Sequence, residues 1–282
     1  MPELPEVEIT VRRLDAALSG AEIESALAPG INALKSFAPP LDALTGRPIE
    51  AVRRRGKQII VDVDGELALL MHLMSSGRLQ LFDKRAGMRD RTSRLLVRLA
   101  DGRELRLREF GTKQAAWAKL LPVDALASED SLASLGPEAW PEPPADLDAR
   151  LDGPRPLHGA LRDQHVIAGI GRSWVDEILW TAELSPFKRG ADLSPDELDR
   201  LRSAMARVLD GAIEHYERTI TLPIPDKLPM PLTVHRHQGE PCPRCGTTLA
   251  AVNYEDYVMS YCPRCQTDGR VLKDRRLSRL LK

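Results

Sequence analysis

The sequence has no long hydrophobic run, only four cysteines in 282 residues, and a formal net charge of -1. Its first twenty residues contain acidic side chains at Glu3, Glu6 and Glu8 and no uninterrupted apolar stretch. A signal peptide or a membrane-spanning helix requires such a stretch, so neither is expected there. These absences predict a cytoplasmic protein without a membrane partner.

The near-zero net charge argues against a nucleic-acid-binding protein, because neutralising phosphates requires clustered Lys and Arg. The charges are, however, unevenly distributed: basic residues crowd 47–113 and return at 270–282, whereas acidic residues crowd 124–152. A neutral total can therefore combine a basic face with an acidic back. If charge were the only observation, ordinary solvated surfaces would be the preferred explanation.

The chain is long enough for two domains, and the first begins with a helix. Val7, Val11, Leu14 and Leu18 recur at helical spacing and Gly20 follows, which predicts one leading amphipathic helix. Between residues 49 and 121 the pattern changes to short apolar or alternating runs separated by turn signals, which is typical of an antiparallel sandwich or barrel. The runs lie at 59–63, 67–73, 79–82, 95–99, 105–107 and 115–120.

A second domain is expected after residue 156. Residues 122–156 are rich in proline and acid and predict a domain junction with two short helices. Helical periodicity follows at 157–184 and 195–218. The segment Gly169-Ile170-Gly171 predicts a tight turn between two helices, with backbone N–H groups able to bind an anion.

All four cysteines lie near the end of the chain, as Cys242-x2-Cys245, sixteen residues, and Cys262-x2-Cys265. This spacing is typical of a zinc ribbon, in which two tight turns present four thiolates tetrahedrally. The residues between the pairs suit two short strands, at 249–252 and 257–261. Because the pattern leaves no open ligand position, we predict one structural zinc ion.

The opening Met-Pro-Glu-Leu-Pro-Glu has two interpretations. Proline and acid are common in a first helical turn, and that explanation suffices for these residues alone. Removal of Met1, however, would leave a secondary amine on Pro2 with a pKa of about 8, which is nucleophilic near neutral pH. Glu3, beside it, is then an obvious proton donor.

Taken together, the motifs resemble the formamidopyrimidine-DNA glycosylase and endonuclease VIII family of base-excision-repair enzymes, over nearly the whole chain. The matching residues are PELPEVE at 2–8, Arg-Gly-Lys at 55–57, His72-Leu73 with Ser76-Gly77, Arg108-x-Phe110-Gly111, Asp163-Gln164 through Gly171 to Asp176-Glu177, and Gly239-Glu240-Pro241-Cys242 through Gln266. The resemblance implies an α+β protein with an N-terminal antiparallel β-sandwich, a helix-two turns-helix element and a zinc hairpin, with double-stranded damaged DNA held between the domains.

The resemblance also implies roles for individual residues. Pro2 would attack C1′ of the damaged nucleotide and form a Schiff base, Glu3 would assist ring opening and proton transfer, and Lys57 would contact phosphate and assist elimination. The residues expected to contact DNA are Arg89, Arg108, Phe110, His158 and Arg172. We therefore predict a monomeric bifunctional glycosylase and AP lyase, associated with the nucleoid through DNA.

Several departures from the family pattern bear on substrate choice. Met74 is displaced by one position from the methionine that the family inserts into DNA, and on a strand this shift would turn it toward the core. Glu109 replaces an arginine, and Arg172 replaces a phosphate-binding asparagine. Tyr257 replaces the zinc-hairpin arginine linked to the second elimination, which predicts that cleavage stops after β-elimination. Residues 219–233 lack the glycine-rich loop of enzymes specific for oxidised guanine, so oxidised pyrimidines or formamidopyrimidines are favoured over 8-oxoguanine.

The predicted division of the chain is a catalytic β-sandwich (1–121), an acidic junction (122–156), a helical DNA-binding domain (157–235), a zinc hairpin (236–266) and a basic tail (267–282). The alternative function is a non-catalytic binder of abasic or distorted DNA on the same scaffold. Pro2, Glu3 and Lys57 argue against that alternative. A zinc-ribbon protein of unrelated function would leave PELPEVE and the glycine turn unexplained.

Overall fold

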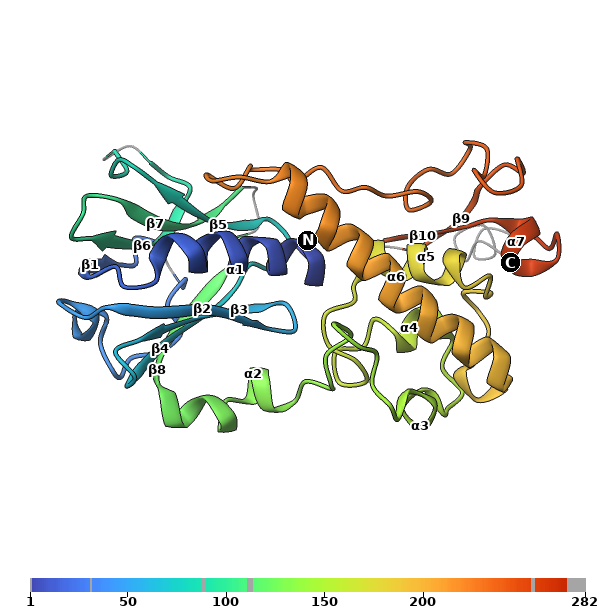
Figure 1. The fold of residues 1–282 in the computed structure, drawn as a ribbon, viewed down its shortest axis with the longest axis horizontal. Helices are drawn as coiled ribbons and strands as arrows, with labels where there is room; N and C mark the ends of the chain where they lie inside the picture. Colours follow the sequence, from blue (N-terminus) through green and yellow to red (C-terminus); the bar gives the residue numbers. More distant parts are fainter. Residues whose placement is uncertain (1, 31, 88–89, 111–113, 255–256, 273–282) are drawn as a thin grey trace, which may run out of the picture. The chain divides into compact units, whose positions relative to one another are not determined.

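The computed structural model describes residues 2–30, 32–87, 90–110, 114–254 and 257–272 (Figure 1). The chain divides into two compact units. The first comprises Met1–Ser134 and Ile213–Pro229, and the second comprises Leu135–Ala212 and Met230–Lys282. Each unit therefore combines two separate stretches of sequence, and the five-part division drawn from the sequence stays a prediction.

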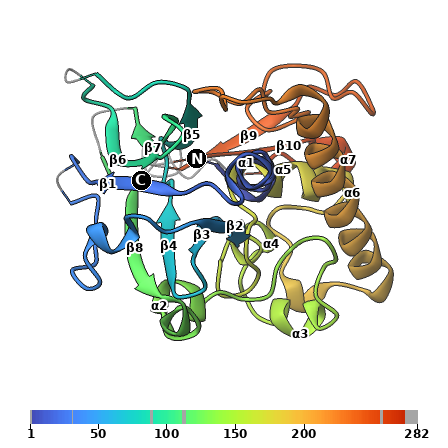
Figure 2. The same cartoon turned by 60° about the vertical axis from the view of Figure 1, so that its left-hand side comes forward.

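Two four-stranded antiparallel sheets build the first unit, in the orders β1-β6-β7-β5 and β2-β3-β4-β8 (Figures 1 and 2). The strands are β1 (Ile23–Leu27), β2 (Ile49–Arg55), β3 (Gln58–Val63), β4 (Leu67–His72), β5 (Gly77–Phe82), β6 (Ser93–Leu99), β7 (Glu104–Glu109) and β8 (Trp117–Pro122). Each of the apolar runs identified in the sequence overlaps one of β3 to β8. The predicted α+β class and antiparallel sandwich are confirmed.

One apolar core lies inside this unit. Alternate residues enter it from the strands, such as Ile59, Val61 and Val63 on β3, because successive side chains of a strand point to opposite faces. Helix α1 (Leu4–Leu18) adds the apolar stripe that includes Val7 and Leu14. The predicted leading helix is thus confirmed, and it begins three residues earlier than its apolar stripe.

The connection between β4 and β5 corrects the expectation for Met74. Strand β4 ends at His72, and Met74 lies in a turn with a left-handed backbone (φ 50°) and a half-buried side chain. Met74 therefore belongs to neither face of a strand, and it is not a core residue. Gly77 closes this turn by donating its N–H to the Leu73 carbonyl (2.8 Å), and a Cβ there would lie 2.3 Å from that oxygen.

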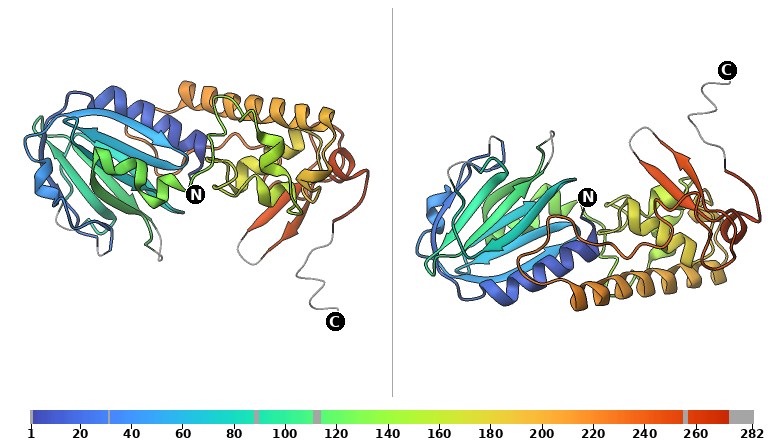
Figure 3. Two further views of the ribbon diagram at one scale, coloured as in Figure 1. Left: turned by 90° about the horizontal axis from the view of Figure 1, so that it is seen from below. Right: turned by 90° about the horizontal axis from the view of Figure 1, so that it is seen from above.

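The remaining elements of the first unit are short: η1 (Leu41–Leu44), η2 (Val123–Ser128) and α2 (Asp130–Ala133). The second unit contains α3 (Leu147–Leu151), α4 (Leu157–Ala160), α5 (Arg172–Thr181) and η3 (Gly190–Asp192). It continues with α6 (Pro195–Thr219), whose residues from Ile213 belong to the first unit, and with β9 (Ala250–Asn253), β10 (Val258–Tyr261) and α7 (Pro263–Thr267). Figure 3 shows the β9–β10 hairpin leading directly into α7.

The helical pattern at 157–184 proves to be two helices of unequal length. Helix α4 is a single turn, and the chain then folds through 161–171 before α5 begins. None of the helices in the described ranges is long and apolar enough to cross a bilayer.

Candidate active site and metal centre

Pro2 and Glu3 occupy the turn that starts α1, and both are buried. Glu3 is the N-cap residue, and it forms a reciprocal capping box with Glu6. The Glu3 backbone N–H donates to Glu6 Oε2 at 2.8 Å, while the Glu3 side chain accepts from the Glu6 backbone. The box fixes the backbone beside Pro2.

Glu6 has a further partner that sequence reasoning missed. Tyr216, on α6, donates its hydroxyl to Glu6 Oε1 at 2.7 Å. Burial, followed by the negative charges of Glu6 and Glu3, raises the pKa of Tyr216. No local signal in the sequence marks Tyr216, because its partner lies 210 residues away.

Lys57 lies in the turn between β2 and β3, which Gly56 makes possible with a φ of 56°. Its side chain is 8% exposed. Gln58, next to it, pairs with His72 at the end of β4. Burial, followed by the positive charges of Lys57 and Lys35, lowers the pKa of His72 to about 4. A neutral imidazole therefore sits among cationic side chains near pH 7.

Trp117 extends this cationic region onto β8. Its ring stacks on His72 with centroids 5.9 Å apart, and the ammonium groups of Lys35 and Lys119 lie 5.5 and 5.7 Å from its centroid. Lys119 also pairs with Glu129 at 2.5 Å. The positive charges of Lys35 and Lys57 near His72 and Trp117 suit the binding of a phosphate.

Arg108, near the end of β7, has its guanidinium fixed from several directions. It donates to Thr92 Oγ1 and Gln80 Oε1 (both 3.0 Å) and pairs with Asp226 Oδ1 (3.1 Å). Its guanidinium carbon also lies 4.6 Å from the centroid of the Phe110 ring. These two predicted DNA-contacting side chains therefore lie together, and Asp226 is an additional contact that the sequence did not indicate.

The departure at Glu109 has a structural explanation. The side chain is buried, and its carboxylate accepts the N–H groups of Ala115 (2.8 Å) and Ala116 (3.1 Å). Arg94 lies 3.6 Å from the same carboxylate. Glu109 thus ties β7 to the chain entering β8, and an arginine, which has no acceptor, cannot make these hydrogen bonds.

In the second unit, Gln164 holds the two-turn segment in shape. Its side-chain amide donates to the Ile170 carbonyl (2.8 Å), and its oxygen accepts from the Gly169 N–H (3.0 Å). Gly169 has a φ of 106°, which favours glycine, and Gly171 is the N-cap of α5. Arg172 consequently occupies the first turn of α5, at its positive end.

The Asp176-Glu177 pair of α5 secures the approach to the hairpin. Glu177 accepts three backbone N–H groups from residues 233–235, at 2.8–3.0 Å. Asp176 accepts from the Ser260 N–H (2.8 Å) and contacts His235 Nδ1 (2.7 Å). These two carboxylates therefore have a structural function, which explains their place in the motif.

Tyr257 is the centre of an aromatic and cationic group. The guanidinium carbons of Arg162 and Arg172 lie 4.2 and 5.2 Å from its ring centroid, and Tyr254 stacks on it at 4.3 Å. His158 also stacks on Tyr257, is 3% exposed, and places Nε2 3.2 Å from Asp176 Oδ1. His158 is thus buried against Tyr257, and its predicted DNA contact stays a prediction.

The four cysteines converge on one point, with every Sγ within 4.8 Å of the others. Cys242 and Cys265 are 3.9 Å apart, and Cys245 and Cys262 are 3.5 Å apart. Tetrahedral zinc with bonds of about 2.3 Å places sulfurs about 3.8 Å apart, so the residues fit this ion. Trp180 donates its indole N–H to Cys242 Sγ at 3.4 Å, a typical outer contact of a metal ligand. The ion would join the turn at Cys242–Cys245 to the start of α7 and supply no chemistry to a reaction.

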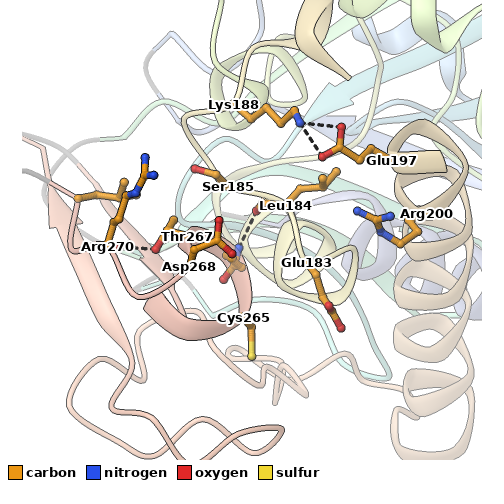
Figure 4. Close-up of a pocket in the computed structure, with 12 residues that line it drawn as sticks. Glu183, Leu184, Ser185, Lys188, Glu197, Arg200, Cys265, Thr267, Asp268 and Arg270 are labelled. Carbon is orange, nitrogen blue, oxygen red and sulfur yellow. Dashed lines mark hydrogen bonds and ion pairs between the residues drawn. The ribbon is translucent and has the colours of Figure 1, made fainter. Parts of the chain in front are cut away.

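Arg89 lies outside the described residues, as does most of the basic tail. A pocket of about 480 Å³ opens in the second unit (Figure 4). Its lining includes Cys265 and the ion pair of Lys188 with Glu197. Its lining contains no predicted catalytic or DNA-contacting residue.

Comparison with known proteins agrees with this geometry. Three family models match in succession: the formamidopyrimidine-DNA glycosylase N-terminal domain (1–112), the formamidopyrimidine-DNA glycosylase H2TH domain (141–223) and the zinc finger found in FPG and IleRS (239–267). A formamidopyrimidine-DNA glycosylase of Chloroflexus aurantiacus is 34% identical over 280 residues, which are 94% of this chain and 98% of that protein. An uncharacterized formamidopyrimidine-DNA glycosylase-like protein of Mycobacterium tuberculosis is 41% identical over 150 residues, 53% of this chain and 95% of its own.

Solved structures give the same answer. The Lactococcus lactis Fpg in complex with abasic-site DNA is 25% identical, with a TM-score of 0.82 over 94% of this chain and 99% of that one. The same enzyme with N7-benzyl-Fapy-dG DNA is 26% identical, with a TM-score of 0.84 over 94% and 100%. The resemblance stated from the motifs is thereby confirmed. This chain belongs to the formamidopyrimidine-DNA glycosylase family and is a DNA glycosylase of base-excision repair with one structural zinc site.

Proposed function

We propose that this glycosylase is also an AP lyase, with Pro2 as its nucleophile once Met1 has been removed. The observation that carries the proposal is the start of α1, where the capping box fixes the Pro2-Glu3 backbone in a member of this family. With Met1 attached, the Pro2 nitrogen is an amide and has no nucleophilic lone pair. Processing is therefore the first requirement of the reaction.

The reaction then follows from the groups present. The Pro2 amine adds to C1′ as the bond from C1′ to the base breaks, and Glu3 gives a proton to O4′ as the sugar ring opens. The product is an iminium ion, which acidifies the proton on C2′. Loss of that proton expels the 3′ phosphate, and water then releases the sugar remnant from Pro2. The Lys57 ammonium stabilises the leaving phosphate, and Lys35 supplies further positive charge.

We propose oxidised pyrimidines or formamidopyrimidines as preferred substrates over 8-oxoguanine. Solved relatives have been captured with ring-opened Fapy-dG DNA and with carbocyclic 8-oxo-G DNA, so the family name alone does not decide the lesion. In this chain, part of the proline-rich segment that follows α6 packs on the sheet. Gln80 contacts Asp226 Oδ1 at 3.0 Å, and Arg78 donates to the Asp226 carbonyl at 2.6 Å. Because Asp226 is hydrogen-bonded to β5, this packing supports a segment that lies against the sheet and does not fold over the base.

The proposed DNA contacts are Arg89, Arg108, Phe110, His158 and Arg172. Arg108 and Phe110 would fill the gap left by the extruded nucleotide, because flipping a base out of the stack leaves a void that inserted side chains occupy. Arg172 would bind a phosphate at the positive end of α5. A monomeric state and a cytoplasmic, nucleoid-associated location remain predictions.

Borohydride trapping on abasic-site DNA tests the enzyme proposal. Protein that has lost Met1, verified by mass spectrometry, should form a covalent adduct, and Pro2→Gly should form none. Binding of uncleaved abasic DNA by Pro2→Gly is the control for folding. If the processed wild-type protein binds this DNA and forms no adduct, the chain is the non-catalytic binder of the alternative hypothesis.

A further inference from the structure

We infer that Tyr216 is a positioning residue for the N-terminal nucleophile, acting through Glu6. The inference rests on the proposed function of Pro2. Its proposed role is indirect, through Glu6 and without contact with substrate, so it is not a catalytic residue. Its hydroxyl sets the orientation of the Glu6 carboxylate, which in turn fixes the Glu3 backbone next to Pro2.

The contacts form a continuous chain of hydrogen bonds. Tyr216 donates to Glu6 Oε1 at 2.7 Å, and the Glu3 N–H donates to Glu6 Oε2 at 2.8 Å. The two oxygens of one carboxylate are thus engaged by different elements. Rotation of the Glu6 side chain would break both bonds, so the tyrosine helps to hold the carboxylate that accepts the Glu3 N–H.

Burial makes the tyrosine hydroxyl important. Glu6 is 3% exposed and Tyr216 is fully buried, so water does not readily replace a lost donor. A buried carboxylate without its hydrogen bonds is strongly destabilised. Because burial and the neighbouring carboxylates raise the pKa of Tyr216, the phenol remains a donor across the working pH range of the enzyme.

Other contacts hold the end of α6 against α1 without the hydroxyl. Arg12 pairs with Glu217 Oε1 at 2.9 Å, and Arg13 donates to the carbonyls of Glu217 (2.7 Å) and Ile220 (2.8 Å). The helix should therefore keep its place when Tyr216 loses only its oxygen. This separates the positioning of Glu6 from the packing of the helix and makes Tyr216→Phe an informative substitution.

The expected effect follows from the geometry of nucleophilic attack. A misplacement of about 1 Å in a reacting group can cost about a hundredfold in rate. A hydrogen bond to a charged group is worth about tenfold to a hundredfold in an equilibrium. For Tyr216→Phe we expect a fall of about ten- to a hundredfold in the single-turnover trapping rate, with the affinity for abasic DNA changed by less than about twofold.

The pH profile of trapping provides a second readout, which loss of packing alone would not move. Glu3 on the same helical turn and Arg78 on β5 are charged groups that also act near Glu6, and both are unchanged in Tyr216→Phe. Without the phenol donor, more negative charge stays on Glu6, and that charge stabilises the protonated form of the nearby amine. The acidic limb of the profile should therefore shift to higher pH in Tyr216→Phe. Glu217→Gln is the matched control, because it weakens contacts between the same helices and leaves the Glu6 hydrogen bonds in place.

The experiment measures borohydride trapping by Met1-free protein under single-turnover conditions across pH, for the wild type and both variants. A slower rate and a shifted profile in Tyr216→Phe alone support the inference. Wild-type kinetics in Tyr216→Phe, or equal losses in both variants without a shift, overturn it while leaving Pro2 as the nucleophile. A wild-type protein that forms no adduct refutes the proposed function and the inference with it.

Discussion

The depressed pKa of His72 predicts a specific acid sensitivity of the first unit. Burial and the charges of Lys57 and Lys35 lower this pKa from 6.5 to about 4. Between these values the unfolded chain binds a proton that the folded chain does not, so stability falls as the pH decreases. The stability is fully present above pH 6.5 and is lost as the pH falls to about 4. At about 1.4 kcal/mol per pKa unit, the loss amounts to about 3 kcal/mol.

His72→Asn isolates this contribution. His72 Nδ1 accepts the Met74 N–H at 2.9 Å, and the asparagine oxygen can accept the same hydrogen bond without titrating. The assay is urea unfolding of both proteins at several pH values, followed by far-ultraviolet circular dichroism and tryptophan fluorescence. The free energy of unfolding should decrease less steeply in His72→Asn, by about 3 kcal/mol in total between pH 6.5 and 4.

A substitution of an exposed histidine provides the control. His165→Asn, in the second unit, should leave the pH dependence of the first unit unchanged. Parallel stability profiles for the wild type and His72→Asn would refute the reasoning, because they would show that His72 binds its proton equally well in the folded and unfolded chain.

Two further predictions concern the second unit. Chelation should remove one zinc ion per chain and destabilise the β9–β10 hairpin, because the four thiolates are the centre of a small core that includes Leu249 and Cys262, the residues that flank the hairpin. An unchanged hydrogen-exchange pattern at 250–261 after zinc loss, measured by mass spectrometry, would contradict this. Cleavage of abasic DNA by the wild type should end mainly at the β-elimination product, and Tyr257→Arg should increase the product that lacks the sugar remnant. Denaturing gels separate the two products. If the wild type gives only the product without the sugar remnant, the predicted effect of Tyr257 is wrong.

Strand positions in the first unit could be predicted from the sequence because each face of a strand has a constant environment. Alternate side chains of β3 and β4 enter one core and most of the others are buried as well, so short, nearly continuous apolar runs mark both strands. The α4 region does not follow this rule: Leu157, Leu161 and Ala168 are buried at helix-like intervals, yet the helix lasts one turn. There the Gln164 hydrogen bonds stabilise turns, and apolar spacing does not reveal them.

The candidate site was predictable where chemistry is local and not where it depends on distant contacts. Cysteine spacing identified the zinc centre, and the prolines and acids of the first residues indicated the first turn of a helix. Tyr216 and Asp226, by contrast, reach their partners from more than a hundred residues away. Glu109 appeared to be a lost arginine, and only the backbone of Ala115 and Ala116 shows what it contributes.

The composition of the first unit has a consequence for biosynthesis. Its sheets and α1 come from Met1–Ser134, but it also includes Ile213–Pro229, which is translated after most of the second unit. A nascent chain that has emerged only as far as the sheets lacks Tyr216, and therefore lacks the donor that orients Glu6 at the start of α1. Domains generally fold in the order of synthesis. In this enzyme, Pro2 is synthesised first, but its surroundings would be completed only after Tyr216 has emerged late in translation.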